Sequence, residues 1–412
     1  MKVLFITTQF PYPLDNGGKI GAYNGLSVLS KEHEITVLSF TEDPDVVMEG
    51  INYFKTIIPK VHFEEPILQA VHIRKKPLKL IKAMAQNYIF NQPYVSSKFD
   101  NKRMYSLIDQ MFANQRWDVI FVDYLNMASY GEYIREKYSD KYSIFVLKDH
   151  NIEYEIVRQE AEKSKGLKKI ILEAEWKRTK KYEERQVSNA DVVFSVCDEN
   201  TQVLKAINKH TYSMLPTFEI LEIDRKYPSA NKLLYMGNLS WGANLSGLKW
   251  FTDNVLPIVK RHVPDVELVV VGSGPTKNIF DEYENVDYRG YVKDITGIYE
   301  DIKVFVVPLF EGSGIRIKIL EAFNNEVPVV STALGCATIG ATNGNEILIR
   351  NEEEEFAEAV ISLLNNQSLN LTIRNNAKNF LEKYFSLDSR CEEINRLIND
   401  HLRGGGNDSG TI

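Results

Sequence analysis

The sequence predicts an α/β protein with two doubly wound domains, each built on a parallel β-sheet. Short apolar segments alternate with longer helical patterns through most of the 412 residues. Segments such as VELVVVG and KVFVVP are almost continuously apolar, as is typical of strands in a parallel sheet that is covered on both faces. A chain of this length also exceeds the usual size of a single hydrophobic core, which favours two domains.

The apolar, β-rich segments give the predicted strands in chain order. In the N-terminal half they are expected at Val3–Thr7, Glu34–Phe40, Val119–Asp123, Ser143–Lys148, Val192–Val196 and Ser213–Leu215. In the C-terminal half they are expected at Leu233–Met236, Val266–Val271, Val286–Tyr288, Val304–Val307, Val327–Ser331 and Glu346–Ile349. Because helical patterns separate the strands, we expect right-handed crossovers between parallel strands.

The boundary between the two domains is expected at residues 217–230. This stretch, TFEILEIDRKYPSA, contains a proline, several charges and no regular hydrophobic period, as a linker does. Residues 1–216 then form the N-terminal domain and residues 231–385 the C-terminal domain. Residues 386–402 predict a last helix that either caps the second domain or crosses back to the first, and we favour the crossing. The glycine-rich residues 403–412 predict a disordered tail.

Composition and charge exclude several classes of protein. The net charge of -7 disfavours a nucleic acid as the partner, since proteins that wrap a polyanion are usually basic. A hydrophobic content of 44% excludes a disordered or fibrous class. Cys197, Cys336 and Cys391 form no CxxC pair and no zinc spacing. We expect them to be small buried side chains in a reducing compartment.

No segment for export or for crossing a membrane is predicted. The first apolar run stops after Ile6, and no apolar run reaches about 18 residues, so we expect a cytoplasmic protein. The basic stretch at residues 73–90, IRKKPLKLIKAMAQNYIF, either contacts anionic lipid at the inner face of the membrane or is a solvated amphipathic helix. We favour the solvated helix, and residues 167–186 predict a second, long exposed helix.

The most informative segment runs from Val304 to Ser331. Its strand is expected to end at Pro308, the turn EGSG follows, and a helix is expected to begin near Gly314. Glycines let backbone amides approach a ligand closely, and a helix N-terminus offers unpaired N–H groups and partial positive charge. These features suit a diphosphate.

Arg316 and Lys318 add two cations to this turn. Residues two apart on a helix point to different sides, so the two cations converge only if Arg316 still belongs to the turn. The alternative is an ordinary strand–turn–helix in which Lys318 and Glu321 form a surface ion pair. We favour the phosphate site.

This segment resembles the donor-binding motif of family 4 retaining glycosyltransferases. The subgroup motif G-S-G-x-R-x-K-x-x-E-A is matched by Gly312, Ser313, Gly314, Arg316, Lys318, Glu321 and Ala322. The resemblance implies the GT-B fold, in which two Rossmann-like domains face each other across a cleft. It also implies that Arg316 and Lys318 hold the diphosphate and that Glu321 binds the ribose hydroxyls.

One position departs from the wider family, which has two glutamates separated by seven residues. The first of that pair, which touches the transferred sugar, corresponds here to Ser313. Glu311 takes its place if the turn is two residues longer. Either way, the donor is expected to contact the whole turn, which comprises Glu311, Gly312, Ser313, Gly314 and Ile315.

Two further loops of the C-terminal half match the family. Gly237 and Asn238 follow the strand LLYM, where the resemblance implies a loop beside the diphosphate, although a glycine–asparagine pair at a strand end is by itself a turn signal. Arg289 to Val292 matches the loop that contacts the nucleotide base, so main-chain groups at Tyr291 and Val292 are expected to read the base edge.

The N-terminal half offers two candidates. Gly17 and Gly18 begin a predicted helix after the first strand, and the resemblance implies that this loop approaches the donor phosphates; a proline/glycine turn without a ligand is equally consistent with the spacing. His150 directly follows a strand, in LKDHNIEYE. A lone histidine is more often structural, but related enzymes place one near the reacting sugar, so we assign His150 to positioning the sugar or the acceptor.

Together these residues predict a retaining, metal-independent hexosyltransferase. The resemblance favours a UDP-linked donor, a glycan or lipid-linked saccharide as acceptor, and a place in the synthesis of a surface polysaccharide or glycoconjugate. We expect His150, Arg316 and Lys318 to be catalytic. The sequence contains no HExxH, DxD or Walker motif, so neither a metal nor another cofactor is expected. The alternative is a non-catalytic GT-B subunit that supports a partner transferase.

Overall fold

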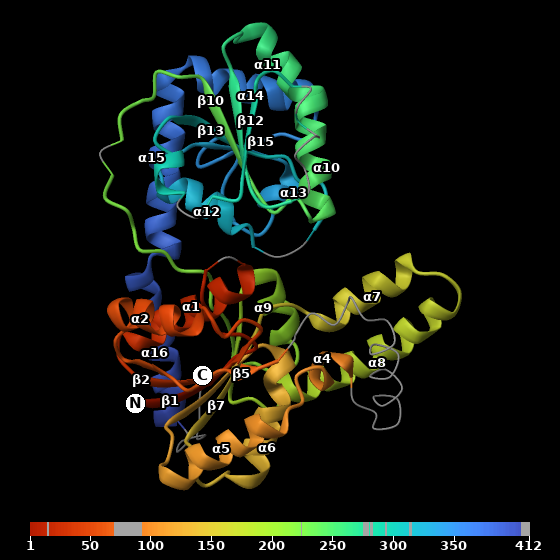
Figure 1. The fold of residues 1–412 in the computed structure, drawn as a ribbon, viewed down its shortest axis with the longest axis vertical. Coiled ribbons are helices and arrows are strands. Elements are labelled where there is room, and N and C mark those ends of the chain that lie inside the picture. The colour runs from red at the N-terminus through yellow and green to blue at the C-terminus, as the bar shows by residue number, and fades with distance from the viewer. Residues whose placement is uncertain are drawn as a thin grey trace, which may run out of the picture. The chain divides into compact units, whose positions relative to one another are not determined.

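The computed structural model divides the chain into two compact units. The first comprises Met1–Thr217 together with the chain from Arg390 onward, and the second comprises Phe218–Ser389 (Figure 1). The residues described are 1–14, 16–69, 93–223, 225–274, 280, 283–292, 295–312 and 315–404. The basic stretch at residues 73–90, the tail, Ser313 and Gly314 therefore lie wholly or largely outside the described residues.

The first unit is built on a seven-stranded sheet in the order β4-β2-β1-β6-β7-β8-β9, and all neighbouring strands are parallel. Its strands are β1 (Lys2–Ile6), β2 (Glu34–Leu38), β4 (Val61–Phe63), β6 (Val119–Asp123), β7 (Ile144–Asp149), β8 (Val192–Ser195) and β9 (Thr211–Ser213). A separate small sheet pairs β3 (Phe40–Thr41) with β5 (Ile67–Leu68). The parallel α/β prediction is confirmed for this unit.

Three details of the strand prediction were wrong. The strand expected at Glu34–Phe40 is interrupted at Ser39, and β3 pairs in the small sheet instead. Strand β9 begins two residues before the position expected from Ser213. Strands β4 and β5 were missed because they have only three and two residues, too few to show a hydrophobic period.

Helices cover both faces of the first sheet. They are α1 (Gly17–Ser30), α2 (Val47–Ile57), α4 (Tyr94–Ser97), α5 (Lys102–Asn114), α6 (Ala128–Lys137), α7 (Glu153–Lys163), α8 (Gly166–Ser188), α9 (Asp198–Lys205) and α16 (Leu387–Gly404). Helices α5 and α6 pack on Leu4, Ile6 and their neighbours. Helix α1 lies on the other face, where its Gly25 approaches Phe5. The long helix expected at residues 167–186 is α8, but it is not exposed throughout, because Glu175, Thr179 and Tyr182 are buried.

The second unit has a six-stranded parallel sheet in the order β12-β11-β10-β13-β14-β15. Its strands are β10 (Lys232–Met236), β11 (Glu267–Val271), β12 (Val286–Gly290), β13 (Ile302–Val307), β14 (Val329–Ser331) and β15 (Leu348–Ile349). Each overlaps a predicted strand, because buried parallel strands are marked by local apolar runs.

The helices of this unit are α10 (Gly242–Trp250), α11 (Leu256–His262), α12 (Ile317–Asn324), α13 (Ala333–Cys336), α14 (Glu353–Asn365) and α15 (Gln367–Phe385). Helices α10, α11 and α14 share one hydrophobic core with the sheet. Helix α10 lies so close to the end of β13 that a Cβ at Gly247 would be 1.9 Å from the Pro308 carbonyl oxygen. This close contact fixes α10 beside the turn that follows β13.

The stretch after Thr217 packs on the second unit. Arg225 donates to the carbonyl oxygens of Asn325 and Glu326, at 2.9 and 2.8 Å, just after the end of α12. Leu221 N donates to Asn324 Oδ1 at 3.0 Å. These contacts hold the stretch along α12.

Helix α16, from Arg390 onward, groups with the first unit. Cys391 Sγ lies 3.6 Å from the carbonyl oxygen of Val28 on α1, and the His401 ring lies edge-on to the ring of His210. Cys197, Cys336 and Cys391 are all buried, as predicted, and all three are free cysteines. Within the described part of the chain, no helix has the length and apolar character that a membrane span requires.

Candidate functional site

The turn after β13 places Arg316 outside helix α12. The helix begins at Ile317, three residues later than the expected start near Gly314. Arg316 caps it with φ -92° and ψ 77°, which is not a helical conformation. The condition for the two cations to converge, that Arg316 belongs to the turn, is therefore met.

Lys318 points toward the end of β10. Its Nζ donates to Asn244 Oδ1 on α10 at 3.3 Å and lies 5.2 Å from the centre of the Tyr235 ring. A Cβ at Gly237 would be 3.0 Å from the same Nζ, so a larger residue would crowd the ammonium group. Lys318 is thus held at the carboxyl ends of two neighbouring strands, where parallel sheets bind ligands.

Arg316 lies against Trp241 and the glycine turn. Its guanidinium carbon is 6.0 Å from the centre of the Trp241 ring, and the residue is buried. Gly312 has φ +105°, and a Cβ there would lie 2.6 Å from the Trp241 ring and 3.1 Å from Arg316 Nη2. The turn therefore requires glycine at this position for both its backbone conformation and its space.

The electrostatics of this cluster favour an anion. Burial lowers the pKa of Lys318 to about 7, with a further lowering from the neighbouring Arg316 that Glu321 only partly opposes. Burial also raises the pKa of Glu321, against the influence of Lys318. The two adjacent cations repel each other, and an anion bound between them would relieve that repulsion.

The remaining donor-loop candidates lie at the same edge of the sheet or close to it. Asn238 uses its side chain locally, since Oδ1 accepts from Ser240 N at 2.9 Å, while its carbonyl oxygen accepts from Asn244 Nδ2 at 2.9 Å. Tyr291 is 63% exposed. The other described candidates of these loops are Val292 and Ile315, both partly buried, and Glu311, which is exposed.

In the first unit, His150 sits directly after β7 in a buried polar group. Its Nε2 lies 2.7 Å from Asp123 Oδ1 at the end of β6. Lys148 Nζ lies 3.3 Å from the same carboxylate oxygen and donates to the carbonyl oxygen of Gly21 on α1 at 2.7 Å. Thr7 Oγ1 donates to Asp123 Oδ2 at 2.8 Å.

These neighbours set the charge of His150. Burial alone would raise the pKa of Asp123, but Lys148 and His150 overcome it and lower that pKa to about 2. Burial and then Lys148 lower the pKa of His150, although Asp123 opposes them. A neutral ring next to an ionised carboxylate carries its proton on Nε2, which leaves Nδ1 as the acceptor.

The Tyr124 ring and two glycines of α1 also fix the position of the His150 ring. Tyr124, whose backbone has φ +84°, stacks on His150 with ring centres 3.6 Å apart. A Cβ at Gly21 would lie 2.7 Å from His150 Cε1, and one at Gly18 would lie 3.2 Å from the Tyr124 hydroxyl. Glycines on α1 thus make room for both rings.

Known proteins resemble the second unit most clearly in sequence. Residues 230–366 match the family model described as glycosyl transferases group 1. Most of the second unit is therefore similar to this glycosyltransferase family.

Two relatives of the chain extend this similarity. An uncharacterised 44.6 kDa protein in the cps region of Klebsiella pneumoniae is 22% identical over 402 residues, which cover 93% of this chain and 96% of that protein. The capsular polysaccharide biosynthesis glycosyltransferase CapM of Staphylococcus aureus is 33% identical over 150 residues, which are 34% of this chain and 39% of CapM.

The fold of the chain is similar to solved structures over nearly its whole length. Sucrose-phosphate synthase from Thermosynechococcus elongatus gives a TM-score of 0.67 at 15% identity, over 98% of this chain and 100% of that one. HepE from Anabaena, in a complex with UDP and glucose, gives a TM-score of 0.62 at 14% identity, over 97% of this chain and 99% of HepE. With its two parallel sheets, the chain has the GT-B fold predicted from the sequence.

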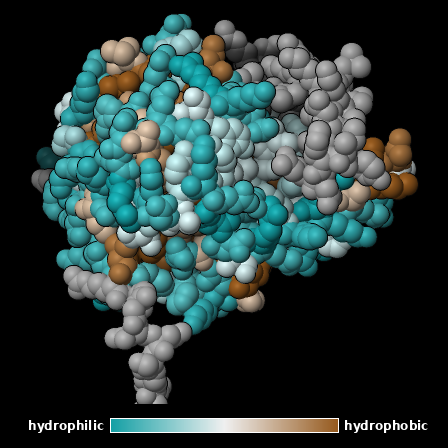
Figure 2. Space-filling view, turned by 90° about the horizontal axis from the view of Figure 1, so that it is seen from below, coloured by the Kyte–Doolittle hydropathy of each residue, from teal (hydrophilic) through white to brown (hydrophobic). Residues whose placement is uncertain are grey.

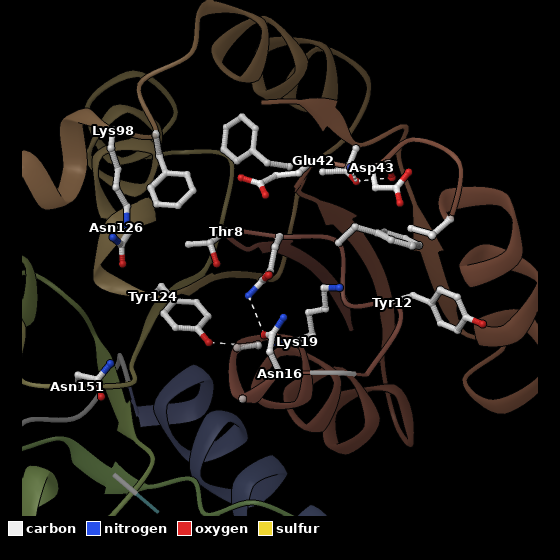
Figure 3. A pocket seen from close by; sticks show the side chains of 18 of the residues that line it. Thr8, Tyr12, Asn16, Lys19, Glu42, Asp43, Lys98, Tyr124, Asn126 and Asn151 are labelled. Atoms are coloured by element: carbon white, nitrogen blue, oxygen red, sulfur yellow. Dashed lines mark hydrogen bonds between the residues drawn. The ribbon is translucent and has the colours of Figure 1, made fainter. Parts of the chain in front are cut away.

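A pocket of about 650 Å³ opens in the first unit (Figure 3). Gly17 and Gly18 line it at the start of α1, where the Asn16 side chain accepts from Lys19 N at 3.0 Å. Tyr124 lines it as well and donates from its hydroxyl to the carbonyl oxygen of Gly18 at 3.2 Å. The wall is polar and of mixed charge, with Lys19, Glu42, Asp43, Lys98, Asn126, Asn151 and Glu153 among its residues.

The sequence did not identify the residues that contact Arg316, Lys318 and His150. These are Asn244, Trp241 and Tyr235 around the two cations, and Asp123, Lys148, Tyr124 and Gly21 around His150. Asp123 and Lys148 carried a visible signal, because charged residues at the ends of apolar strands are rarely buried without a partner. Among the residues that the structure describes, no three His, Cys, Asp or Glu side chains gather as a metal site would require.

Proposed function

We propose that the chain is a glycosyltransferase that moves a hexosyl group from a UDP-linked donor to a glycan or lipid-linked saccharide, with retention of the anomeric configuration. The observation that carries this proposal is the convergence of Arg316 and Lys318 beside the turn at Gly312. Two cations at the carboxyl ends of parallel strands suit the diphosphate of a nucleotide sugar.

Several residues take their roles from this assignment. Arg316, Lys318 and the amides at the start of α12 bind the diphosphate and stabilise the charge that develops on it as the sugar leaves. Glu321, one turn along α12, takes the ribose hydroxyls. Main-chain groups at Tyr291 and Val292 take the base. Neither a metal nor another cofactor is assigned to this site.

The first unit is assigned to the acceptor. Its pocket combines aromatic side chains, which pack on the apolar faces of sugar rings, with amides and charged groups that hydrogen-bond hydroxyls. His150, kept neutral and oriented by Asp123, positions the reacting sugar or the acceptor through Nδ1. No protein nucleophile is assigned, and a donor phosphate oxygen accepts the proton of the acceptor hydroxyl in a front-side attack.

The biological setting follows from the relatives. One lies in a cps region and another acts in capsular polysaccharide biosynthesis. HepE, of similar fold, is described in a complex with UDP and glucose. We therefore place the reaction in the synthesis of a surface polysaccharide, with UDP-linked sugars as donors on the cytoplasmic side of the membrane.

Donor binding is tested by the thermal stability of the protein with UDP-, GDP- and ADP-sugars. We expect the UDP-sugar to raise the unfolding temperature most, because ligands that bind only the folded state stabilise it. Glu321→Ala is expected to reduce the UDP-sugar shift without lowering the unfolding temperature of the unliganded protein. Absence of a shift with every nucleotide sugar would refute the donor site.

Catalysis is tested separately with His150→Ala. UDP release in the presence of saccharide acceptors should fall by about a hundredfold or more, since a positioned polar group typically contributes that much. The thermal shift with UDP-sugar should stay near the wild-type value. Unchanged turnover would remove His150 from the site, and product with inverted configuration by NMR would exclude the retaining mechanism.

A further inference from the structure

Helices α7 and α8 form an antiparallel hairpin whose far end is unusually apolar. The two helices meet at Ser164–Lys165, and the first turns of α8 expose three large aliphatic side chains. Leu167 is 73% exposed, Ile170 64% and Ile171 39%. Their spacing of three and four residues puts them on one side of α8. Figure 2 shows hydrophobic atoms gathered at this end of the hairpin, on the right.

The base of the hairpin, in contrast, is firmly anchored. Glu183 is fully buried and accepts from the backbone N–H groups of Glu153 and Tyr154 at 3.0 and 2.9 Å, which ties α8 to the start of α7. Glu175 also accepts a hydrogen bond from Tyr94 N. The hairpin therefore holds its apolar end away from the core of the unit, as Figure 1 also shows.

Lysines surround the apolar end. Lys163, Lys165, Lys168 and Lys169 all lie within the stretch KSKGLKKIIL, which contains no acidic residue. Lys168 pairs with Glu160 at 3.1 Å and Lys169 approaches Glu173 at 3.9 Å, so carboxylates of the neighbouring turns offset part of the charge of these two lysines. A chain with a net charge of -7 thus carries a local positive end around exposed aliphatic side chains.

We infer that this tip, residues 163–171, inserts into the interface of an anionic lipid bilayer. Aliphatic side chains flanked by lysines fit the boundary between acyl chains and negatively charged headgroups. A second copy of the chain fits poorly, because a symmetric tip-to-tip contact would bring the lysines of both copies together. Three aliphatic side chains also fall far short of the roughly 800 Å² that each partner of a stable protein complex buries.

The inference is tested by co-sedimentation of the full chain with phosphatidylcholine vesicles that contain or lack phosphatidylglycerol. We expect binding to the anionic vesicles that weakens as salt is added, since surface charges are screened. The variant Leu167→Ser/Ile170→Ser/Ile171→Ser should bind at least about tenfold more weakly, because it loses three apolar anchors. Neither donor nor acceptor is present, so the result is independent of the proposed function.

Two matched controls come from the same unit. Met48→Ser/Leu68→Ser/Val203→Ser removes apolar side chains of similar exposure, at 66%, 62% and 42%, and should leave vesicle binding unchanged. Lys163→Gln/Lys165→Gln/Lys169→Gln should weaken binding roughly fivefold per lysine at low salt. Substituting the exposed lysines Lys55, Lys102 and Lys205 with Gln should have a much smaller effect.

Three results would overturn the inference. The first is wild-type binding by the Leu167→Ser/Ile170→Ser/Ile171→Ser variant, and the second is equal loss in the matched aliphatic control. The third is concentration-dependent self-association of the wild type that the tip substitutions abolish, which would assign the tip to contact between copies. Near-identical circular dichroism and unfolding temperature of the variants ensure that each result reports on the surface rather than on folding.

Discussion

Lys318 shows how the surroundings of one side chain set its chemistry. Its ammonium group is held between Asn244, the Tyr235 ring and Gly237, and burial beside Arg316 lowers its pKa to about 7. In this state the protonated and neutral forms are both populated near neutral pH. A bound diphosphate stabilises only the protonated form and therefore raises the pKa of Lys318.

Binding of a UDP-sugar is expected to depend on pH through Lys318. Below about pH 7, Lys318 is already protonated in the free protein, so the affinity for UDP-sugar is constant. Above about pH 7, binding must take up a proton at Lys318. The affinity therefore falls by up to about tenfold per pH unit until the pH reaches the higher pKa of Lys318 in the complex. Isothermal titration calorimetry between about pH 6 and about pH 8.5, in buffers of different ionisation enthalpy, measures both the affinity and the proton uptake.

The variant Lys318→Met supplies the control for this titration. It should bind UDP-sugar about 10- to 100-fold more weakly at low pH, as expected for loss of a charged hydrogen bond. Its affinity should then vary little with pH. A wild-type affinity that is flat across the range, or a slope that persists in the variant, would contradict the role given to Lys318.

Lys148 is expected to keep His150 neutral. In Lys148→Met the Asp123 carboxylate still attracts a proton to the ring while the opposing ammonium is gone, so the pKa of His150 should rise. NMR titration of the ring measures this directly, and the acidic limb of the pH–rate profile should move to higher pH. An unchanged acidic limb would contradict the prediction that Lys148 lowers the pKa of His150.

The same substitution has a cost in stability. Removing one partner of a buried ion pair typically destabilises a protein by about 3–5 kcal/mol. The double variant Lys148→Met/Asp123→Asn leaves no uncompensated carboxylate and should recover part of that loss. It provides a folded sample if the single variant unfolds.

At the scale of the element, helix α10 connects the core of the second unit to its cations. Gly247 on its inner side touches the Pro308 carbonyl oxygen, and Asn244 one turn earlier holds Lys318. A shift of the helix therefore moves the proposed donor site. At Gly242, the exposed start of the same helix, an added Cβ would meet no atom of the described residues within 4 Å.

Gly247→Ala is expected to push α10 away from β13. The added Cβ has only 1.9 Å to a backbone oxygen, so we expect a loss of at least about 2 kcal/mol in the free energy of unfolding, and weaker UDP-sugar binding. Gly242→Ala should be neutral or stabilise by up to about 1 kcal/mol, because alanine is the better helix former. Denaturant unfolding and calorimetry compare the two. Equal stability of both variants would show that the contact is not tight.

At the scale of the whole molecule, the chain leaves the first unit at Thr217 and returns to it at Arg390. The returning helix α16 buries Cys391, Ile394 and Ile398, spaced three and four residues apart. Both ends of the chain thus contribute to the core of the same unit. The stability of that unit should depend on a helix far from it in sequence.

Ile394→Ala/Ile398→Ala is therefore expected to destabilise the first unit, by about 2–5 kcal/mol for each buried isoleucine. Hydrogen exchange should become faster in β1 and α1 while the second unit keeps its protection. Glu392→Ala, on the exposed side of α16, is the control. Faster hydrogen exchange in the second unit instead of the first would contradict the assignment of α16 to the first unit.

The chain alone determined most strands of the two large sheets, though not β4, and the place of the candidate turn. A buried parallel strand can be predicted from its own run of apolar residues. A glycine turn with two cations can likewise be predicted from neighbouring positions in the sequence. Neither prediction requires knowledge of contacts with distant residues. The start of α12 was predicted three residues too early. The non-helical conformation of Arg316, which ends the turn, cannot be predicted from the types of residue around it.

Only the tertiary structure decided what holds each candidate side chain. The partner of Lys318 lies 74 residues away along the chain, and the acceptor of the Lys148 hydrogen bond lies 127 residues away. The charge of a buried group depends on such neighbours and on burial, neither of which is encoded in the residues next to it. For that reason the sequence pointed to Lys318 and His150, but the packing of other segments set their pKa values and orientations.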